Sequence, residues 1–211
     1  APPGGFRGDP AFAPTLTAII ESFGHPSPPE PSAVIDRLIR EHHRSSPHPH
    51  PEIDLLHIFR EALVATEDTN LTSLVETVED ARISCEPMPG AVETLHSLAA
   101  QGICLGILSN AQSNTLGVLD RLLDGATSLL DPELTVLSYQ HGMAKPSPEL
   151  FQLLAERLAQ SGISPQETLF VGNDPLQDID PAKGAGFLTP LFLGHPSSLR
   201  PGECHPDLRL Q

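Results

Sequence analysis

TLFVGNDPLQDIDPAKGAGF, residues 168–187, is the stretch that decides the fold. It begins with a short apolar run, residues 169–171, which ends at Gly172. Polar side chains that suit metal or phosphate chemistry follow at once: Asn173, Asp174 and Asp178. This order predicts a buried strand that delivers carboxylates to the carboxyl edge of a parallel sheet, where open α/β folds bind their ligands. The small residues of 182–186 would let the next helix pack closely against that sheet.

Upstream of this stretch, the first third of the chain has helical patterns and no strand pattern. After a Pro- and Gly-rich loop at residues 1–14, apolar residues recur at helical spacing in four segments, about 15–23, 32–44, 52–65 and 71–80. Ser32 is expected to cap the second of these helices. Four consecutive amphipathic helices predict a small helical module of about residues 10–83.

From residue 87 onward, helix and strand patterns alternate with short connections. Helices are expected at about 91–100, 115–123, 148–160 and from 182, and strands at 103–108, 134–139, 168–171 and 188–193. The strand at 103–108 is expected to be buried on both faces, and residues 208–210 form at most an edge strand. The alternation predicts an α/β fold: a parallel sheet with helices on both faces. We therefore expect two domains, 1–86 and 87–211.

Composition narrows the range of partners and compartments. The 211 residues include 27 acidic and 12 basic ones, for a net charge of -15, which disfavours binding to nucleic acid or to anionic membranes. Three cysteines in dissimilar settings argue against a disulfide framework or a cysteine-based metal site. No apolar run reaches the ~18 residues of a membrane span, and the first residues do not resemble a leader peptide. A cytoplasmic location is expected.

Three predicted strand ends meet at one edge of the predicted sheet. The first supplies Ser109 and Asn110, the second leads to a loop with Lys145, and the third supplies Asp174 and Asp178. A hydroxyl, backbone amides, a cation and carboxylates that can fix Mg²⁺ are the groups needed to handle a phosphoryl group. The set lacks a nucleophile.

These segments resemble the haloacid dehalogenase superfamily in order and spacing. The resemblance covers about residues 87–193 and rests on PGAVETLHSLAAQGICLGILSN (89–110), GMAKPSPELF (142–151) and FVGNDPLQDIDPAKGAGF (170–187). It implies a Rossmann-like core, a helical cap domain before that core, and Mg²⁺-dependent phosphatase activity, which most members have. The four predicted helices would be the cap.

The resemblance also implies roles for single residues. Ser109 would bind phosphate, with Asn110 beside it, and Lys145 would neutralise a phosphoaspartyl species. The metal ligands would come from the acidic motif at Asn173, Asp174 and Asp178. Many relatives carry Asp where this chain has Asn173, so the ligand at this point is either Asn173 or Asp174. Asp178 could instead cap or orient the helix that follows it.

The family's first motif is missing from this sequence. Relatives begin with a strand that ends in D-x-D-x-T or D-x-D-x-V, whose first Asp attacks phosphorus and whose second acts as acid and base. No such strand occurs here. Three explanations stay open: the sequence starts after that strand, the protein is a relative that has lost the nucleophile, or another residue replaces it. The first strand lies in the middle of the family's sheet, so its loss would leave neighbouring strands unpaired.

The expected function is that of a Mg²⁺-dependent phosphoric monoester hydrolase that acts on a small phosphorylated metabolite through a phosphoaspartyl intermediate. The alternatives are a dehalogenase-type hydrolase, which needs no Mg²⁺, and a non-catalytic binding or regulatory protein. The histidines of 42–50 are interpreted as solvated residues of a Pro-rich loop rather than as metal ligands, because that loop lacks the i, i+4 geometry of a helix.

Overall fold

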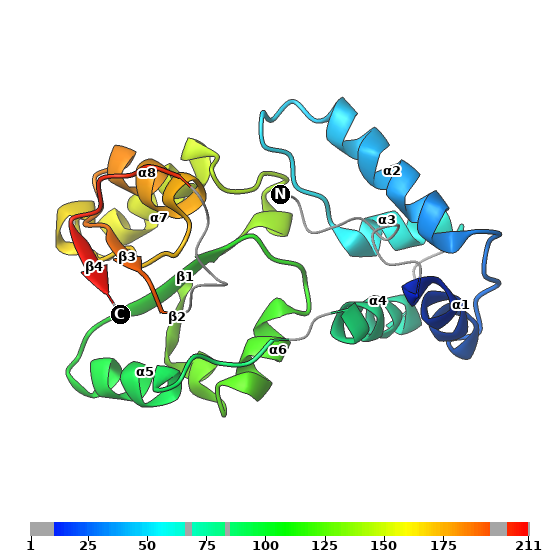
Figure 1. Ribbon diagram of the computed structural model, residues 1–211, viewed down its shortest axis with the longest axis horizontal. Helices are drawn as coiled ribbons and strands as arrows, with labels where there is room; N and C mark the ends of the chain where they lie inside the picture. Colours follow the sequence, from blue (N-terminus) through cyan, green and yellow to red (C-terminus); the bar gives the residue numbers. More distant parts are fainter. Residues whose placement is uncertain (1–10, 66–68, 83–84, 195–201, 211) are drawn as a thin grey trace.

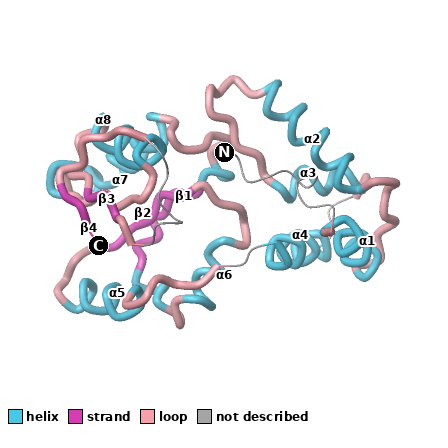
Figure 2. Tube along the Cα trace, in the orientation of Figure 1, coloured by secondary structure: helices cyan, strands magenta, loops and turns pink. Residues whose placement is uncertain are grey.

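The computed structural model describes residues 11–65, 69–82, 85–194 and 202–210. Four helices lie together on one side, and an α/β arrangement lies on the other (Figure 1). Loops, several of them long, connect these elements (Figure 2). None of the helices in the described ranges has the length and apolar character needed to cross a membrane.

The helical module consists of α1 (Phe12–Ser22), α2 (Pro31–Ser45), α3 (Leu55–Ala62) and α4 (Thr69–Arg82). The four helices share one hydrophobic core, as their amphipathic patterns predict. Its fully buried side chains include Leu16 and Ile20 of α1, Ile35 of α2, Ile58 and Phe59 of α3, and Leu71, Leu74 and Val75 of α4. The predicted number and order of these helices are confirmed in the described residues.

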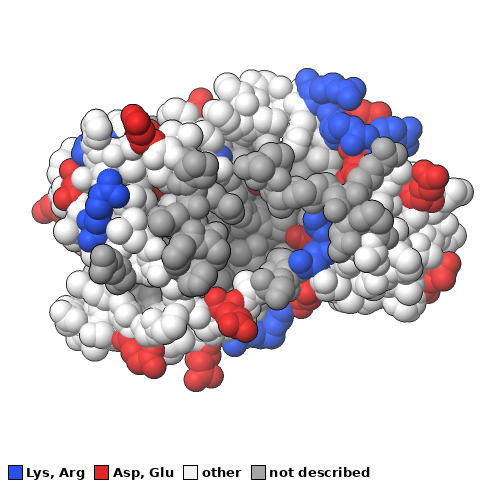
Figure 3. All heavy atoms as spheres, in the orientation of Figure 1, with Lys and Arg blue, Asp and Glu red and all other residues white. Residues whose placement is uncertain are grey.

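The start of α2 and the setting of its last histidines differ from the prediction. Ser32 is not the N-cap, because the helix begins at Pro31, and Glu30 takes the cap position with a left-handed φ of 52°. Proline fits the first helical position because its φ is already helical and its missing N–H would be unpaired there. At the other end the helix stops at Ser45, close to the predicted residue 44. His42 and His43 lie in its last turn, so the interpretation of these two histidines as loop residues is wrong. Exposed arginines, Arg37, Arg40 and Arg44, place basic side chains over α2 (Figure 3).

The α/β part contains two pairs of parallel strands. β1 (Leu105–Ser109) pairs with β2 (Leu130–Leu137), and β3 (Pro190–Phe192) pairs with β4 (Leu208–Leu210). The helices of this part are α5 (Ala91–Ala100), α6 (Thr115–Leu122), α7 (Pro148–Gln160) and α8 (Asp180–Gly184). α5 and α6 lie on one side of the strands and α7 and α8 on the other (Figure 1). The predicted fold class, a Rossmann-like parallel sheet with helices on both faces next to a helical unit, is confirmed.

Residues 168–172, the predicted strand of the deciding stretch, run parallel to residues 188–192. The Phe170 N–H donates to the Leu188 carbonyl at 2.8 Å. The Gly172 N–H donates to the Pro190 carbonyl at 3.3 Å, and the Gly172 carbonyl accepts from the Phe192 N–H at 2.8 Å. Only one face is buried: Phe170 is 9% exposed, whereas Leu169 is 62% and Val171 53% exposed. The prediction of a fully buried strand is therefore wrong here. It is also wrong for 103–108, where Ile103 is 48% exposed.

The pair β1–β2 and residues 168–172 pack against the same helix, α7. Leu108 of β1, Val136 of β2 and Phe170 belong to one core with Phe151 of α7. Phe170 also contacts the ring of Phe187, at 5.8 Å between ring centroids. Within the described residues, β1 pairs with β2 alone, and 168–172 pairs along one edge alone. In the described residues the strands therefore form two separate groups, and β1 and residues 168–172 each have one edge without a described partner.

The loop between α2 and α3 attaches the helical module to the α/β part. The Glu52 N–H donates to the Gly142 carbonyl at 3.0 Å, and the Ala144 N–H donates to the His50 carbonyl at 2.8 Å. The Gln112 side chain, which follows β1, donates to the Ile53 carbonyl and accepts from the backbone of α3. The division into domains 1–86 and 87–211 stays a prediction, although each part has its own core.

Candidate functional site

Asn110, at the end of β1, holds the backbone of Lys145. Its Oδ1 accepts from the Lys145 N–H at 2.7 Å, and its Nδ2 donates to the Lys145 carbonyl at 3.3 Å. The same Nδ2 lies 3.4 Å from Oε1 of Gln177, in the turn after residues 168–172. One amide side chain therefore links all three segments that the sequence predicts to meet.

Lys145 forms an ion pair with Asp178. Its Nζ lies 2.6 Å from Asp178 Oδ1, and the two side chains are only 15% and 7% exposed. The other carboxylate oxygen, Oδ2, accepts from the backbone N–H groups of Asn173 at 3.1 Å and Asp174 at 3.0 Å. Both oxygens of Asp178 are thus engaged, which fixes the direction of the lysine and stabilises the buried charge of the acid.

Asp174 caps the turn that follows it. Its Oδ1 accepts from the N–H groups of Leu176 at 3.0 Å and Gln177 at 2.9 Å, at the start of a single π-helical turn, Pro175–Ile179. Its Oδ2 accepts no hydrogen bond within the described residues. One oxygen of Asp174 is therefore left for a ligand.

Ser109 is half-buried at the end of β1, and its Oγ lies 3.4 Å from the Asn110 carbonyl.

Gly172 makes room for the Asp178 carboxylate. A Cβ at position 172 would lie 2.3 Å from Asp178 Cβ and 2.7 Å from its Cγ, which is too close for any real side chain. Only glycine therefore lets the π-helical turn fold back far enough for Asp178 to reach both Lys145 and the backbone of 173–174.

The structure thus brings Ser109, Asn110, Lys145, Asp174 and Asp178 to one edge, with Asn173 beside them. Two further residues belong to the arrangement. Gln177 contacts Asn110, and the buried Ser138, directly after β2, donates to Glu52 Oε2 at 2.7 Å and accepts from the Ala111 N–H at 2.9 Å. The position of Ser138 at a strand end was a signal for it in the sequence; nothing in the sequence pointed to Gln177.

Comparison with known proteins assigns the chain to a family. The family model for haloacid dehalogenase-like hydrolases matches residues 18–186. Among curated proteins, the phosphoserine phosphatase of Thermus thermophilus is 30% identical over 160 residues, which are 72% of this chain and 59% of that protein. The glyceraldehyde 3-phosphate phosphatase of Methanocaldococcus jannaschii is 29% identical over 121 residues, 56% of this chain and 50% of that protein.

The phosphoglycolate phosphatase of Escherichia coli is 36% identical over 98 residues, 46% of this chain and 36% of that protein. This chain therefore matches about half the length of these curated relatives, or less. A solved HAD phosphatase from Thermococcus onnurineus superposes with a TM-score of 0.58 at 21% identity, covering 95% of this chain and 84% of that one. A 2-haloacid dehalogenase from Pseudomonas syringae pv. Tomato DC3000 gives the same TM-score and identity, covering 100% and 87%. The fold is shared with both, and the chain belongs to the haloacid dehalogenase-like hydrolases.

Proposed function

We propose that this hydrolase is a phosphatase that removes phosphate from a small phosphorylated metabolite with the help of Mg²⁺. The observation that carries the proposal is the Lys145–Asp178 ion pair, held at 2.6 Å at the edge where Ser109, Asn110 and Asp174 also lie. Family membership and the three phosphatase relatives support it. A small, anionic substrate fits a site with one fixed cation and a hydroxyl.

Each residue of the site has a role in this proposal. Ser109 Oγ and neighbouring N–H groups bind the phosphate oxygens. The Lys145 ammonium group neutralises the charge that develops on the phosphoryl oxygens, as a fixed cation does in a partly buried site. Asp178 positions Lys145. We assign it to this task rather than to the metal, because both of its oxygens are already engaged.

The residues at the edge fit Mg²⁺, which prefers oxygen ligands and keeps several waters. Asp174 Oδ2, which accepts no hydrogen bond in the described residues, is the first choice of ligand, and the Asn173 side chain is the second. When bound, Mg²⁺ would draw charge from the phosphoryl oxygens. One or two protein oxygens together with substrate and water are a normal set for this ion.

The attacking group would be an aspartate of the family's first strand, which this sequence lacks and which would fit between β1 and residues 168–172. Both segments have an edge without a described partner, and both pack in the same core. A strand there would pair with N–H and C=O groups of both segments and end at the same edge as Ser109 and Asp174. Its carboxylate oxygen would bond to phosphorus as the ester P–O bond breaks. The second Asp of the same motif would protonate the leaving alcohol, and it would then take a proton from the water that attacks phosphorus and releases phosphate from the first Asp.

In the same proposal α1–α4 act as a cap that excludes water and selects the substrate. The attachment of the α2–α3 loop to residues 138–144, close in sequence to Lys145, supports this role. The substrate and the cytoplasmic location remain predictions.

The test is the release of phosphate from 2-phosphoglycolate, phosphoserine and glyceraldehyde 3-phosphate with and without Mg²⁺. Lys145→Ala should lower kcat at least about 100-fold, because it removes a group that stabilises the transition state. Lys183→Ala is the matched control, since Lys183 is the second of the two lysines in the sequence and bonds to Asp207, away from this edge. It should keep full activity. Circular dichroism checks that both variants are folded.

Equal loss of activity in both lysine variants would contradict the site. A second measurement, phosphate binding by calorimetry, separates the alternatives. Lys145-dependent binding without turnover would favour a non-catalytic relative, which the absence of the first motif permits. Halide release from 2-haloacids without Mg²⁺ would favour a dehalogenase. That alternative is supported by Asn173, which stands where many relatives have Asp, because a dehalogenase needs no Mg²⁺ ligand there.

A further inference from the structure

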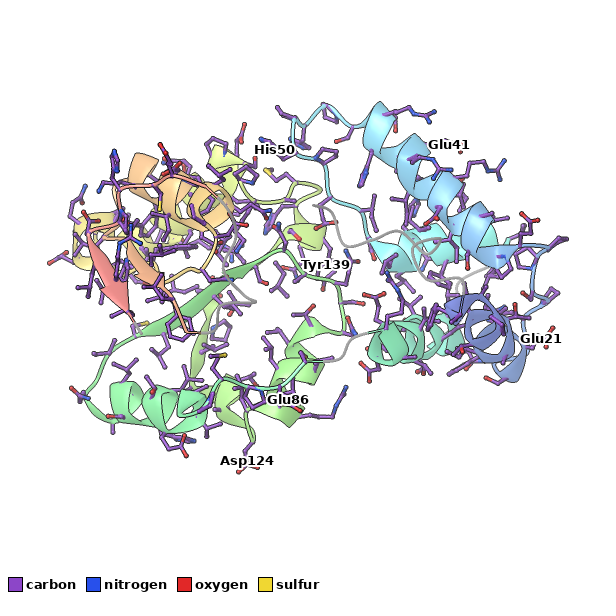
Figure 4. The ribbon with its side chains drawn as sticks, in the orientation of Figure 1. Glu21, Glu41, His50, Glu86, Asp124 and Tyr139 are labelled. Carbon is purple, nitrogen blue, oxygen red and sulfur yellow. The ribbon has the colours of Figure 1, made fainter. Side chains whose placement is uncertain are left out.

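A second cluster of metal-binding side chains lies in the helical module, on α2 and α3. His42 comes from the last turn of α2, and His57 and Glu61 come from α3. His57 and Glu61 are four residues apart, so they share one face of α3. Glu41, the neighbour of His42, is exposed on α2, and His50 lies in the loop that follows (Figure 4). Among the described residues this is the one group of three or more such ligands.

The three side chains already converge. One ligand atom from each lies within 4.8 Å of the other two. His42 Nε2 is 2.9 Å from Glu61 Oε2, and the His42 and His57 rings meet edge to face with 5.2 Å between their centroids. In a tetrahedral zinc site with bonds of about 2.0–2.1 Å, ligand atoms are about 3.4 Å apart. Small side-chain rotations would therefore bring the three ligands to that geometry.

The helices that carry these side chains are held by the core of the module. Leu38, one turn before His42, and Ile58, next to His57, are 5% and 0% exposed. The backbone positions are therefore set by packing and do not depend on an ion. The side chains of His42 and Glu61 are 34% and 47% exposed, so an ion could enter from solvent. A preformed frame with accessible ligands lowers the cost of binding.

We propose that His42, His57 and Glu61 form a Zn²⁺ site with an open fourth position for water. Two imidazole nitrogens and one carboxylate are a donor set that Zn²⁺ favours and Mg²⁺ does not. The ion would take the place of the proton between His42 Nε2 and Glu61. By joining α2 to α3 it would hold the two ends of the loop that carries Glu52 to Ser138 of the α/β part. This proposal does not depend on phosphatase activity.

The test is titration of the metal-free protein, produced without a histidine tag, with Zn²⁺ and with Co²⁺ as a spectroscopic probe. We expect one equivalent of Co²⁺ to give the visible bands of a tetrahedral site and to be displaced by Zn²⁺ but not by excess Mg²⁺. His57→Ala and Glu61→Gln should each weaken binding by about 100-fold or more, because loss of an outer partner alone costs 10–100-fold. At free Zn²⁺ about 100 times Kd, Tm should rise by roughly 5–10 °C.

His96→Ala is the matched control, since His96 is an exposed histidine on α5 outside the cluster, and it should bind like the unchanged chain. The double variant His48→Ala and His50→Ala tests the neighbouring loop and should also bind normally. Binding that is lost in the loop variant and kept in His57→Ala would overturn the proposal, as would the absence of one-equivalent binding of either metal. Both cluster positions on α3 are exposed, so folding should survive and circular dichroism checks it.

Discussion

Gly172 has no space for a side chain, and the position of Lys145 depends on it. A methyl group there would overlap Asp178, which could then no longer reach Lys145 and the N–H groups of 173–174 together. Gly172→Ala should therefore lower the free energy of unfolding by about 1–3 kcal/mol, the usual cost of overpacking. It should also weaken phosphate binding, because Lys145 loses its orienting partner. Urea unfolding and calorimetry measure the two effects.

Gly117 provides the comparison for that substitution. It lies in α6, is exposed, and has no atom within 4 Å of an added Cβ. Gly117→Ala should raise the free energy of unfolding by about 0.5–1 kcal/mol, because alanine loses less backbone entropy in a helix. If both alanine variants changed stability in the same direction, the close approach at Gly172 would not be the cause.

At the scale of elements, the short strand β4 is attached through Asp207. Asp207 Oδ2 accepts from the N–H and the hydroxyl of Thr189, both at 2.9 Å, and Oδ1 accepts from Lys183 Nζ at 3.0 Å. The hydrogen bond from the Thr189 backbone, followed by those from Lys183 and the Thr189 hydroxyl, lowers the pKa of Asp207 from 3.8 to about 2. Because the folded pKa is the lower one, this contribution to stability is present above pH 3.8 and is lost as the pH falls toward 2.

An NMR titration of the Asp207 carboxyl group measures this directly. The midpoint should lie near pH 2 in the folded protein. Lys183→Ala should raise it only part of the way, because the Thr189 N–H still donates, and Thr189→Val, which keeps the N–H and removes the hydroxyl, should act similarly. A midpoint at 3.8 in the unchanged chain would mean that β4 is not held through Asp207.

Patterns of the local sequence predict elements well where the ends are marked chemically. α5 and α7 have the predicted bounds, since Pro89-Gly90 precedes the first and Ser147-Pro148 begins the second. Burial was harder to predict, because an apolar run such as 169–171 does not show whether one or both of its faces are covered. The π-helical turn at 175–179 was missed, since it depends on Asp178 folding back over Gly172, a contact with no periodic pattern.

In the candidate site, too, the sequence predicts which segments meet but not which atoms contact one another. The sequence predicts that Ser109, Lys145 and Asp174 meet, because parallel strands bring their carboxyl ends to one edge. It could not show that both oxygens of Asp178 serve Lys145 and the backbone, since hydrogen-bond partners are set by the tertiary structure. The metal cluster was missed for a related reason. The loop interpretation of 42–50 removed His42 from a helix face, and its partners lie 15 or more residues away.

At the scale of the whole molecule, Glu52 joins the helical module to the α/β part. Oε2 accepts from Ser138 Oγ at 2.7 Å, and Oε1 accepts from the Ile53 N–H at 3.0 Å. Ser138 is fully buried and also accepts from the Ala111 N–H, so its hydroxyl connects Glu52 to the segments after both β1 and β2. Burial is the largest influence on Glu52 and raises its pKa above 4.5, against the hydrogen bonds from Ser138 and Ile53 and the charge of His43.

A raised pKa in the folded state has a definite consequence for stability. The folded protein binds this proton more readily than the unfolded chain, so the contribution of Glu52 is fully favourable below pH 4.5 and is lost as the pH rises through the folded pKa. Glu52→Gln keeps the shape without the charge and removes this dependence. The free energy of unfolding of the variant, relative to the unchanged chain, should therefore improve from pH 4.5 to pH 7. Asp207 cannot mimic this trend, because its titration lies below pH 3.8. Urea unfolding at several pH values measures the difference, and a constant offset between the two proteins would show that Glu52 is not buried at this junction.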